Sequence, residues 1–308
     1  MTDTGLVPLF EQKFTNFLEL KLQQGGSKLR RHVNESSMTG AKLASPVNHM
    51  GAVAMKAPTG RYAPKENTPQ VFTRRWVAPV DRELDQYFDT FDELKTQVDP
   101  KSPAVTNASH AAGRFIDDQI IVAATAASTI GPDAGSLTTE TFDTAIYKIA
   151  DNFGASAAVG LTVKKLNEGR RVLEKYHNDL MSDPAVLIIG SQQHSDLRDQ
   201  AQVVSSDFNR NGGVLTDGQV TRFMGFAVEV MERLPIIATN TRGCLLIVKS
   251  GLHLGVWKDM QTRMFQRGDL SGNPWDINTM ISVGATRTQL GKVIQIACKD
   301  TTGADINP

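Results

Sequence analysis

The opening of this chain constrains its fold most, because the first eighty residues cannot bury themselves in one compact domain. Apolar positions recur with helical spacing only over residues 5–22. They are Leu6, Phe10, Phe14, Phe17, Leu18 and Leu22. Gly25 and Gly26 end that pattern, and Lys28 to Leu43 is polar with little periodicity. One interpretation is a disordered tail; the other, which we favour, is a segment ordered by contacts with neighbouring copies.

A hairpin is predicted next, over residues 46–80. Val47 to Ala57 is small and apolar, and the stretch from Pro58 to Pro69 is rich in turn residues. The second arm alternates, with Val71, Thr73, Arg75 and Val77 on one face and Phe72, Arg74, Trp76 and Ala78 on the other. Because an isolated two-stranded hairpin is marginally stable in water, we expect this one to lie on another surface.

Charge is divided sharply between this hairpin and the segment that follows it. Residues 46–80 carry a net charge of +4, and residues 81–99 carry −5. The two blocks either fold onto each other, pair between neighbouring copies, or remain solvated faces. Our hypothesis is the contact between copies. Its hairpin side comprises Lys56, Arg61, Lys65, Arg74, Arg75 and Trp76, and its acidic side comprises Asp81, Glu83, Asp85, Asp89, Asp92 and Glu93.

A long helix is predicted from Ser102 to Ser128. Ser102 is a suitable N-cap, Pro103 suits the first helical position, and Gly131-Pro132 is a stop signal. Further helices are predicted at Thr139–Phe153, Thr162–His177 and from Gly190-Ser191 to Gln200. Strands are predicted at Ala185–Ile189, Phe226–Met231, Cys244–Val248, Leu254–Trp257, Asn278–Arg287 and Val293–Cys298, with a polar loop at residues 205–219. Helices and strands are mixed without strict alternation, which predicts an α+β fold.

Composition excludes several classes of protein. A content of 40% hydrophobic residues rules out global disorder, and no apolar run reaches the length that crosses a bilayer. The 33 basic and 33 acidic residues balance, which argues against a dedicated nucleic-acid-binding protein. No secretory signal is visible at the start. Cys244 and Cys298 lie in apolar stretches without a CxxC partner, which predicts reduced, buried thiols.

Catalytic, cofactor-binding and metal-binding motifs are absent from the sequence. There is no phosphate loop, dinucleotide fingerprint, serine elbow or zinc-ligand spacing. His194 and Asp196 are better explained as polar residues of a short helix, and Asp117-Asp118 as a solvated or salt-bridged helix face. The sequence DFNRNGG from Asp207 to Gly213 lacks the alternating ligands and closing glutamate of a calcium loop. We therefore predict no catalytic residues, no cofactor and no metal.

The order of these features resembles the major capsid proteins of tailed bacteriophages, which share the Hong Kong ninety-seven-type fold. The most specific part is the run DPKSPAVTNASHAAGRFIDDQII from Asp99 to Ile121, supported by GFAVEVMERLP from Gly225 to Pro235. The resemblance implies an N-terminal arm at 1–45, an extended E-loop at 46–80, and a P-domain with a spine helix at 81–138. It further implies a mainly A-domain segment with part of the P-domain at 139–270, and a return to the P-domain at 271–308.

Several expectations follow from the resemblance. Copies would form pentamers and hexamers of an icosahedral virion capsid, assembled in the bacterial cytoplasm around double-stranded DNA without sequence readout. Because little chain precedes the arm, we expect a separate scaffolding protein, with a portal and a decoration protein as further partners and no membrane. We predict no covalent crosslink through Lys56 or Lys65. The alternatives are an encapsulin-like compartment shell, which would package a cargo enzyme, and an α+β enzyme without a readable motif.

Overall fold

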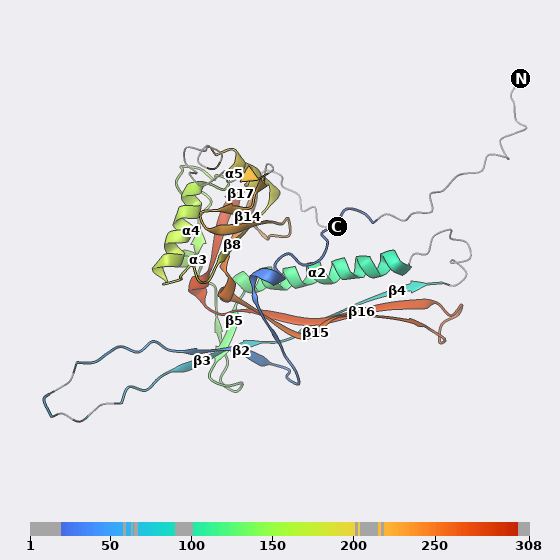
Figure 1. Ribbon diagram of the computed structural model, residues 1–308, viewed down its shortest axis with the longest axis horizontal. Helices are drawn as coiled ribbons and strands as arrows, with labels where there is room; N and C mark the ends of the chain where they lie inside the picture. Colours follow the sequence, from blue (N-terminus) through green and yellow to red (C-terminus); the bar gives the residue numbers. More distant parts are fainter. Residues whose placement is uncertain are drawn as a thin grey trace, which may run out of the picture. The chain divides into compact units, whose positions relative to one another are not determined.

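The computed structural model describes residues 20–57, 60–62, 64, 67–89, 101–200, 203, 215–216 and 219–300 (Figure 1). The protein is α+β, as predicted, and it divides into two compact units. The first unit draws on residues 1–27, 81–114 and 258–281, and the second on residues 28–80, 115–257 and 282–308. The expected helical pattern before residue 20, the acidic residues after 89, the tip residues Lys65 and Glu66, and most of the polar loop at 205–219 lie outside the described residues.

A seven-stranded sheet forms the core of the second unit. Its order is β11 (Arg222–Phe223), β12 (Phe226–Val230), β8 (Ala185–Ile189), β14 (Thr241–Val248), β17 (Val293–Lys299) and β7 (Lys148–Ile149), with β13 (Ile236–Ala238) paired to β14. Every residue of β8 and of β14 is buried. Continuous apolar runs of this kind belong to strands covered on both faces, which is why the sequence predicted them correctly.

Two of the predicted helices border this sheet. α4 (Val163–Lys175) begins at Thr162, whose side chain accepts a hydrogen bond from the Lys165 backbone N–H. It packs on β17, and Gly169 allows the close approach because a Cβ there would lie 3.1 Å from a Leu246 methyl carbon. α5 (Ser191–Arg198) follows β8, as expected.

The long predicted helix is confirmed as α2 (Lys101–Thr125), but it ends earlier than predicted. Ser128 to Gly131 instead form strand β5, which pairs with β3 (Phe72–Val77). β2 (Ala44–Met50) and β6 (Thr138–Glu140) complete this four-stranded sheet, whose order is β2, β3, β5, β6. The β-branched Thr129 and Ile130 suit a strand, and an available partner strand decided their conformation.

The helix predicted at Thr139–Phe153 is wrong. Thr139 pairs with Thr129 in the sheet, and Asp143 caps a helix of only four residues, α3 (Thr144–Tyr147). β7 follows at once and pairs with β17 in parallel. The apolar residues of this segment are spaced as in a helix, but its backbone forms hydrogen bonds with the edges of two sheets instead. Tertiary pairing overrode the local pattern.

The first unit contains the amino-terminal part of α2, strand β4 (Val80–Phe88), and the parts of β15 (Leu252–Gln266) and β16 (Trp275–Arg287) that it includes. Within this unit β16 pairs with both β15 and β4. Strand β4 was not predicted, because its many charged residues obscure the alternation of apolar and polar side chains that is typical of a strand. Lys101 places its ammonium 4.6 Å from the centre of the Trp275 ring, and Arg114 donates to the Gln23 side chain at 2.6 Å.

Residues 28–37, where the sequence showed little periodicity, are structured. A 3₁₀ turn (Arg30–His32) leads into β1 (Asn34–Ser37), which pairs in parallel with β15. Leu29 is 1% exposed. The fully buried Asp117 accepts hydrogen bonds from the backbone N–H groups of Lys28 and Leu29, both at 3.0 Å. Part of the expected amino-terminal arm therefore packs on its own chain.

Candidate assembly surface

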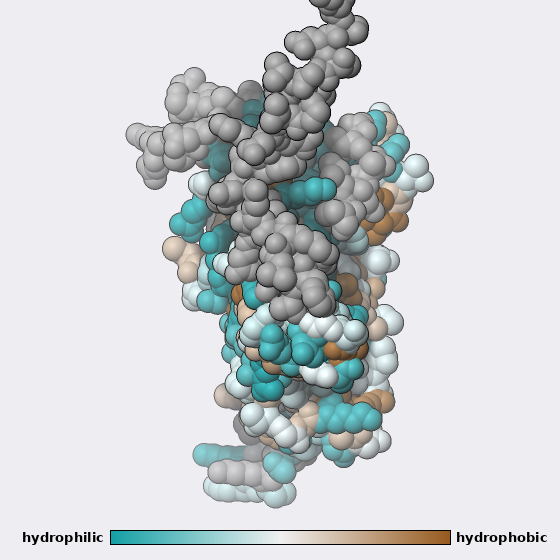
Figure 2. All heavy atoms as spheres, turned by 90° about the vertical axis from the view of Figure 1, so that its right-hand side faces the viewer, coloured by the Kyte–Doolittle hydropathy of each residue, from teal (hydrophilic) through white to brown (hydrophobic). Residues whose placement is uncertain are grey.

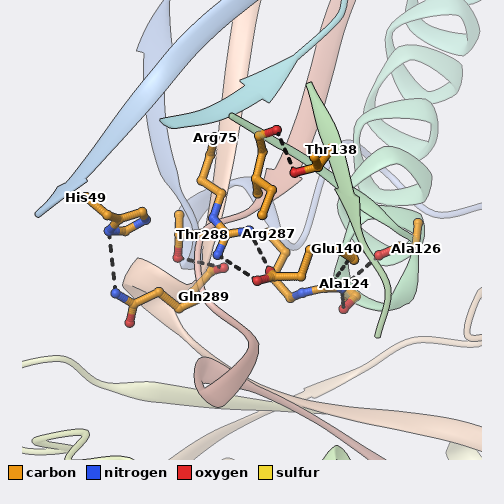
Figure 3. Close-up of polar contacts among 11 residues, drawn as sticks. His49, Arg75, Ala124, Ala126, Thr138, Glu140, Arg287, Thr288 and Gln289 are labelled. Carbon is orange, nitrogen blue, oxygen red and sulfur yellow. Dashed lines mark hydrogen bonds and ion pairs between the residues drawn. The ribbon is translucent and has the colours of Figure 1, made fainter. Parts of the chain in front are cut away.

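The root of the hairpin is fastened to its own chain. The Arg75 guanidinium on β3 forms an ion pair with Glu140 on β6 at 2.5 Å, and Arg75 is only 8% exposed (Figure 3). On the opposite face of the strand, the Trp76 indole N–H donates to the Gly131 carbonyl at 3.2 Å. Because a two-residue alternation sends neighbouring side chains to opposite faces, both faces of β3 are held at this point.

Arg287 on β16 joins this root to the end of the long helix. It is fully buried and donates to the carbonyls of Ala124 at 3.0 Å and Ala126 at 2.8 Å (Figure 3). Those carbonyls lack helical partners because α2 ends there. The guanidinium also lies 5.3 Å from the centre of the Phe142 ring. Burial lowers the pKa of Arg287 to about 10, with a further lowering by the nearby charge of Arg75.

His49 on β2 completes the group of titratable residues at the root. Its Nδ1 lies 3.5 Å from the side-chain nitrogen of Gln289 (Figure 3). Burial lowers the pKa of His49, and the positive charge of Arg75 lowers it further. His49 is therefore neutral at neutral pH, which suits a position beside a cation.

The predicted hairpin contacts consequently separate into two groups. Arg75 and Trp76 have partners inside the chain, and whether they also contact a neighbour stays a prediction. Lys56, Arg61 and Arg74 are exposed on the hairpin. Lys65 lies outside the described residues. The alternation in β3 separates Arg74 from Arg75, since Arg74 points away from the face on which Arg75 meets Glu140. Trp76 shares the face of Arg74 but is held by its bond to Gly131.

Large apolar side chains accompany these basic residues. Those exposed along the hairpin are Met50, Val53, Met55, Tyr62, Val71 and Phe72. Met55 and Tyr62 are 102% and 93% exposed, so the chain itself covers nothing of them. On the face drawn in Figure 2, hydrophobic side chains are scattered among hydrophilic ones over the coloured residues. A concentration of exposed apolar residues beside positive charge is typical of an interaction site.

The acidic residues that the sequence predicts as the other side of this contact lie on and after strand β4. Asp81, Glu83 and Asp85 alternate along it and are exposed. The side-chain amide of Asn278 on β16 donates to both Glu83 and Asp85, which aligns these two carboxylates. Asp89 follows the strand, whereas Asp92 and Glu93 lie outside the described residues. The strand thus presents three acidic residues on one face, and the carboxylates of Glu83 and Asp85 converge on one amide nitrogen.

The two residues considered as catalytic candidates in the sequence, His194 and Asp196, form hydrogen bonds with the backbone of their own chain. His194 Nε2 accepts from the Val220 backbone N–H at 3.2 Å, and Asp196 accepts from the Leu161 N–H at 3.0 Å. Asp118 forms an ion pair with Arg233 at 2.5 Å, which confirms the salt-bridged interpretation for this residue. Asp117 is instead fully buried and accepts from backbone N–H groups. Cys244 and Cys298 are free and buried, as predicted.

Two searches of the described part of the chain bear on other kinds of site. Among these residues, no three metal-ligating side chains come together to form a candidate metal centre. Similarly, no helix that the structure describes has the length and hydropathy to span a bilayer.

Sequence reasoning missed Glu140, Arg287 and Lys165. Lys165 on α4 is fully buried and donates to four backbone carbonyls at 2.8–3.0 Å, those of Asp151, Val159, Gly160 and Ala297. For Arg287 the available signal was the single cation in the predicted strand Asn278–Arg287, whereas Lys165 follows Lys164 in a helix with several basic residues and gave no such signal. Such a residue is buried only when it satisfies other groups.

A comparison with known protein families shows which family this chain belongs to. A family model described as "Phage capsid protein" matches residues 7–300. The chain belongs to this family. It is a major capsid protein, a structural component of the icosahedral phage head, and its place is the virion capsid. The family therefore favours the viral shell over an encapsulin-like compartment.

Solved capsid structures share the fold of this capsid protein. The capsid of cyanophage P-SCSP1u matches with a TM-score of 0.73 and 14% identity, over 97% of this chain and 96% of that one. The cyanophage Pam1 capsid matches with a TM-score of 0.72 and 11% identity, over 100% of both chains. Mycobacterium phage Che8 matches with a TM-score of 0.66 and 12% identity, over 96% and 98%. No curated protein sequence matches.

Proposed function

We propose that this capsid protein assembles into hexamers and pentamers through its hairpin, which lies on strand β4 of a neighbouring copy. The shell encloses double-stranded DNA, and the protein has no enzymatic role. In this proposal residues 46–80 act as the E-loop, residues 1–45 as the amino-terminal arm, residues 81–138 as the P-domain with α2 as its spine, and residues 139–270 mainly as the A-domain. Residues 271–308 return the chain to the P-domain.

The exposed apolar residues of the hairpin carry this proposal. The root is held by the ion pair of Arg75 with Glu140 and by Trp76, whereas Met55 and Tyr62 beyond it are fully exposed. A fastened root loses little conformational entropy when the hairpin binds. Exposed methionine and aromatic side chains then supply the apolar area that a neighbour buries.

Electrostatics supports β4 as the partner of the hairpin. The outward-facing Arg74 and the exposed Lys56 and Arg61 meet a row of carboxylates on β4, two of which Asn278 aligns. Complementary charge of this kind sets register and accelerates encounter more than it adds affinity. The apolar contacts provide the affinity, and the charges direct the hairpin to the correct strand.

The chain's overall charge fits a container. Lys and Arg number 33, as do Asp and Glu, so many copies pack together without net repulsion. A shell that encloses DNA without reading its sequence needs no basic groove. A separate scaffolding protein, a portal and a decoration protein are the further partners we propose.

Reversal of one exposed charge tests the hairpin contact. We expect Arg74→Glu to reduce shell yield at least fivefold, because it places a carboxylate against the acidic strand, where each close like-charge pair is unfavourable by roughly 1 kcal/mol. The second change Asp81→Arg in the same chain should restore the yield. Shells are counted by electron microscopy and sedimentation, and circular dichroism establishes that each variant is folded.

Arg222→Glu is the matched control, since Arg222 is also an exposed arginine on a strand of the second unit. It should assemble normally. Wild-type shell yield from the folded Arg74→Glu variant would refute the proposed contact, and so would a rescue that fails while Asp81→Arg alone assembles.

A further inference from the structure

An apolar groove lies on the second unit, between α4 and the segment that was wrongly predicted as a helix. Its volume is about 410 Å³. The apolar residues that line it are Ala145, Ile146, Ile149, Ala150, Phe153, Val172 and Tyr176. Because the segment from Thr144 to Phe153 is not one helix, its apolar residues do not all turn inward. Ile146 remains 48% exposed, and Phe153 and Tyr176 remain 37% exposed.

The rim of this groove is positively charged. Lys148, Glu168, Arg171 and Lys175 lie along it, with a net charge of +2. Glu168 is already paired with Arg171 at 2.5 Å, which lowers the pKa of the Glu168 carboxyl and keeps it ionised. A ligand for this groove should therefore be apolar on one face and acidic beside it.

One segment of the chain outside the described residues has both properties. The side chains of residues 1–19 carry a net charge of −2, from Asp3, Glu11 and Glu19 against Lys13. Leu6, Phe10, Phe14, Phe17 and Leu18 recur in it at helical spacing, with Val7 and Leu9 as further apolar residues. Phenylalanines at positions i, i+4 and i+7 form one stripe of a helix, the pattern by which amphipathic helices dock into grooves.

We propose that the groove between α4 and residues 145–153 binds the amino-terminal segment, residues 6–18, as an amphipathic helix. Phe10, Phe14 and Phe17 occupy the apolar floor, and Glu11 meets Lys175 at the rim. The carboxy-terminal residues 301–308 make a poor alternative, because Ile306 is their one bulky apolar residue. This inference deepens the proposed function, since it gives the amino-terminal arm a specific receptor.

Disulfide trapping in assembled shells tests the proposal. The full chain carries Phe14→Cys with Ile146→Cys, and the native Cys244 and Cys298 are buried and do not compete. Under mild oxidation we expect this pair to crosslink at least tenfold faster than Phe14→Cys with Met181→Cys, because docking raises the effective concentration. Met181 is a suitable control position, since it is 96% exposed in the same unit and does not line the groove. Peptide mapping identifies the linked residues.

Charge exchange gives an independent measurement on the same shells. Lys175→Glu should slow the crosslink at least threefold, and Glu11→Lys should restore it, as expected for a direct ion pair. Phe10→Cys with Phe153→Cys serves as a second pair if the first variant assembles poorly. Equal crosslinking at Ile146 and Met181 in intact shells would overturn the groove assignment. It would leave the hairpin contact standing, because Arg74→Glu and its rescue by Asp81→Arg test that contact separately.

Discussion

Single buried polar residues hold the junctions of this capsid protein together. Asp117, Lys165 and Arg287 are all fully buried, and each satisfies backbone groups that regular secondary structure leaves unpaired. Leaving a buried backbone group without a partner is unfavourable by about 1–3 kcal/mol. These three side chains therefore stabilise the fold locally, and removal of any one of them is expected to lower the free energy of unfolding.

Arg287→Met should destabilise the chain by about 3 kcal/mol, because it orphans the carbonyls of Ala124 and Ala126 at the end of α2. Arg287→Lys should recover only part of the loss, since one ammonium cannot reproduce the guanidinium fork. Thermal and urea unfolding of unassembled protein measure both. Equal stability of Arg287→Met and wild type would show that water satisfies those carbonyls.

Lys165 predicts a dependence of stability on pH with a definite sign. Burial lowers the pKa of Lys165 below its ordinary value of 10.5. Between the lowered pKa and 10.5 the unfolded chain binds more protons than the folded chain, so this residue's contribution to stability rises with pH in that window. The free energy of unfolding of wild type minus that of Lys165→Met should therefore increase toward pH 10.5. A flat or falling difference would contradict the burial of a charged lysine.

At the scale of elements, the packing of α2 depends on close backbone approach. Gly113 lies where a Cβ would come within 2.4 Å of the Gly26 carbonyl carbon and 2.6 Å of the Ser27 nitrogen. Alanine is the better helix former by about 1 kcal/mol, so an isolated helix would gain from the exchange. Here the segment that crosses the helix requires the glycine.

Gly113→Ala should therefore displace residues 20–27 from α2 and leave the helix intact. Hydrogen exchange of amides in residues 23–28 should accelerate at least tenfold, while amides within α2 keep their protection. Gly268→Ala is the control, because a Cβ there meets nothing within 4 Å. Unchanged exchange in residues 23–28 would mean that the crossing segment accommodates a methyl group.

At the scale of the whole molecule, complementary charge and apolar area have separate roles. The hairpin brings exposed arginine and lysine together with exposed methionine and aromatic residues, and β4 brings carboxylates. Charge acts at a distance and governs the rate of encounter, whereas apolar contact acts only after docking. The salt concentration distinguishes the charge interactions from the apolar contacts, because the electrostatic screening length falls from about 10 Å at 0.1 M to about 3 Å at 1 M.

Raising NaCl from about 0.1 M to about 1 M should slow the initial rate of assembly at least tenfold while preformed shells remain intact. Light scattering follows the rate, and electron microscopy counts the shells. If salt dissolves preformed shells and leaves the initial rate unchanged, the ionic contacts supply affinity and the proposed division of roles is wrong.

Local sequence features by themselves determined much of the secondary structure of this protein. The N-cap at Thr162 predicted the start of α4, because a side-chain cap acts within one turn of helix. The apolar stripe predicted α2, but Ser102 lies inside that helix, so the N-cap predicted there is wrong. The continuous apolar runs Ala185–Ile189 and Cys244–Val248 also predicted buried strands correctly, because such runs are typical of strands that are covered on both faces. The exposed basic and apolar residues of the hairpin were also legible, except that Arg75 and Trp76 turned out to face its anchor.

Tertiary structure alone decided where a strand found its partner. Residues 139–153 have a helical apolar pattern, yet the edges of β5 and β17 took Thr139 and Ile149 into sheets. Likewise, residues after Thr125, where α2 ends, pair with β3 as strand β5, and Arg287 donates to the last carbonyls of the helix. Backbone hydrogen bonds between segments far apart in sequence depend on the completed fold, and no local spacing of side chains encodes them.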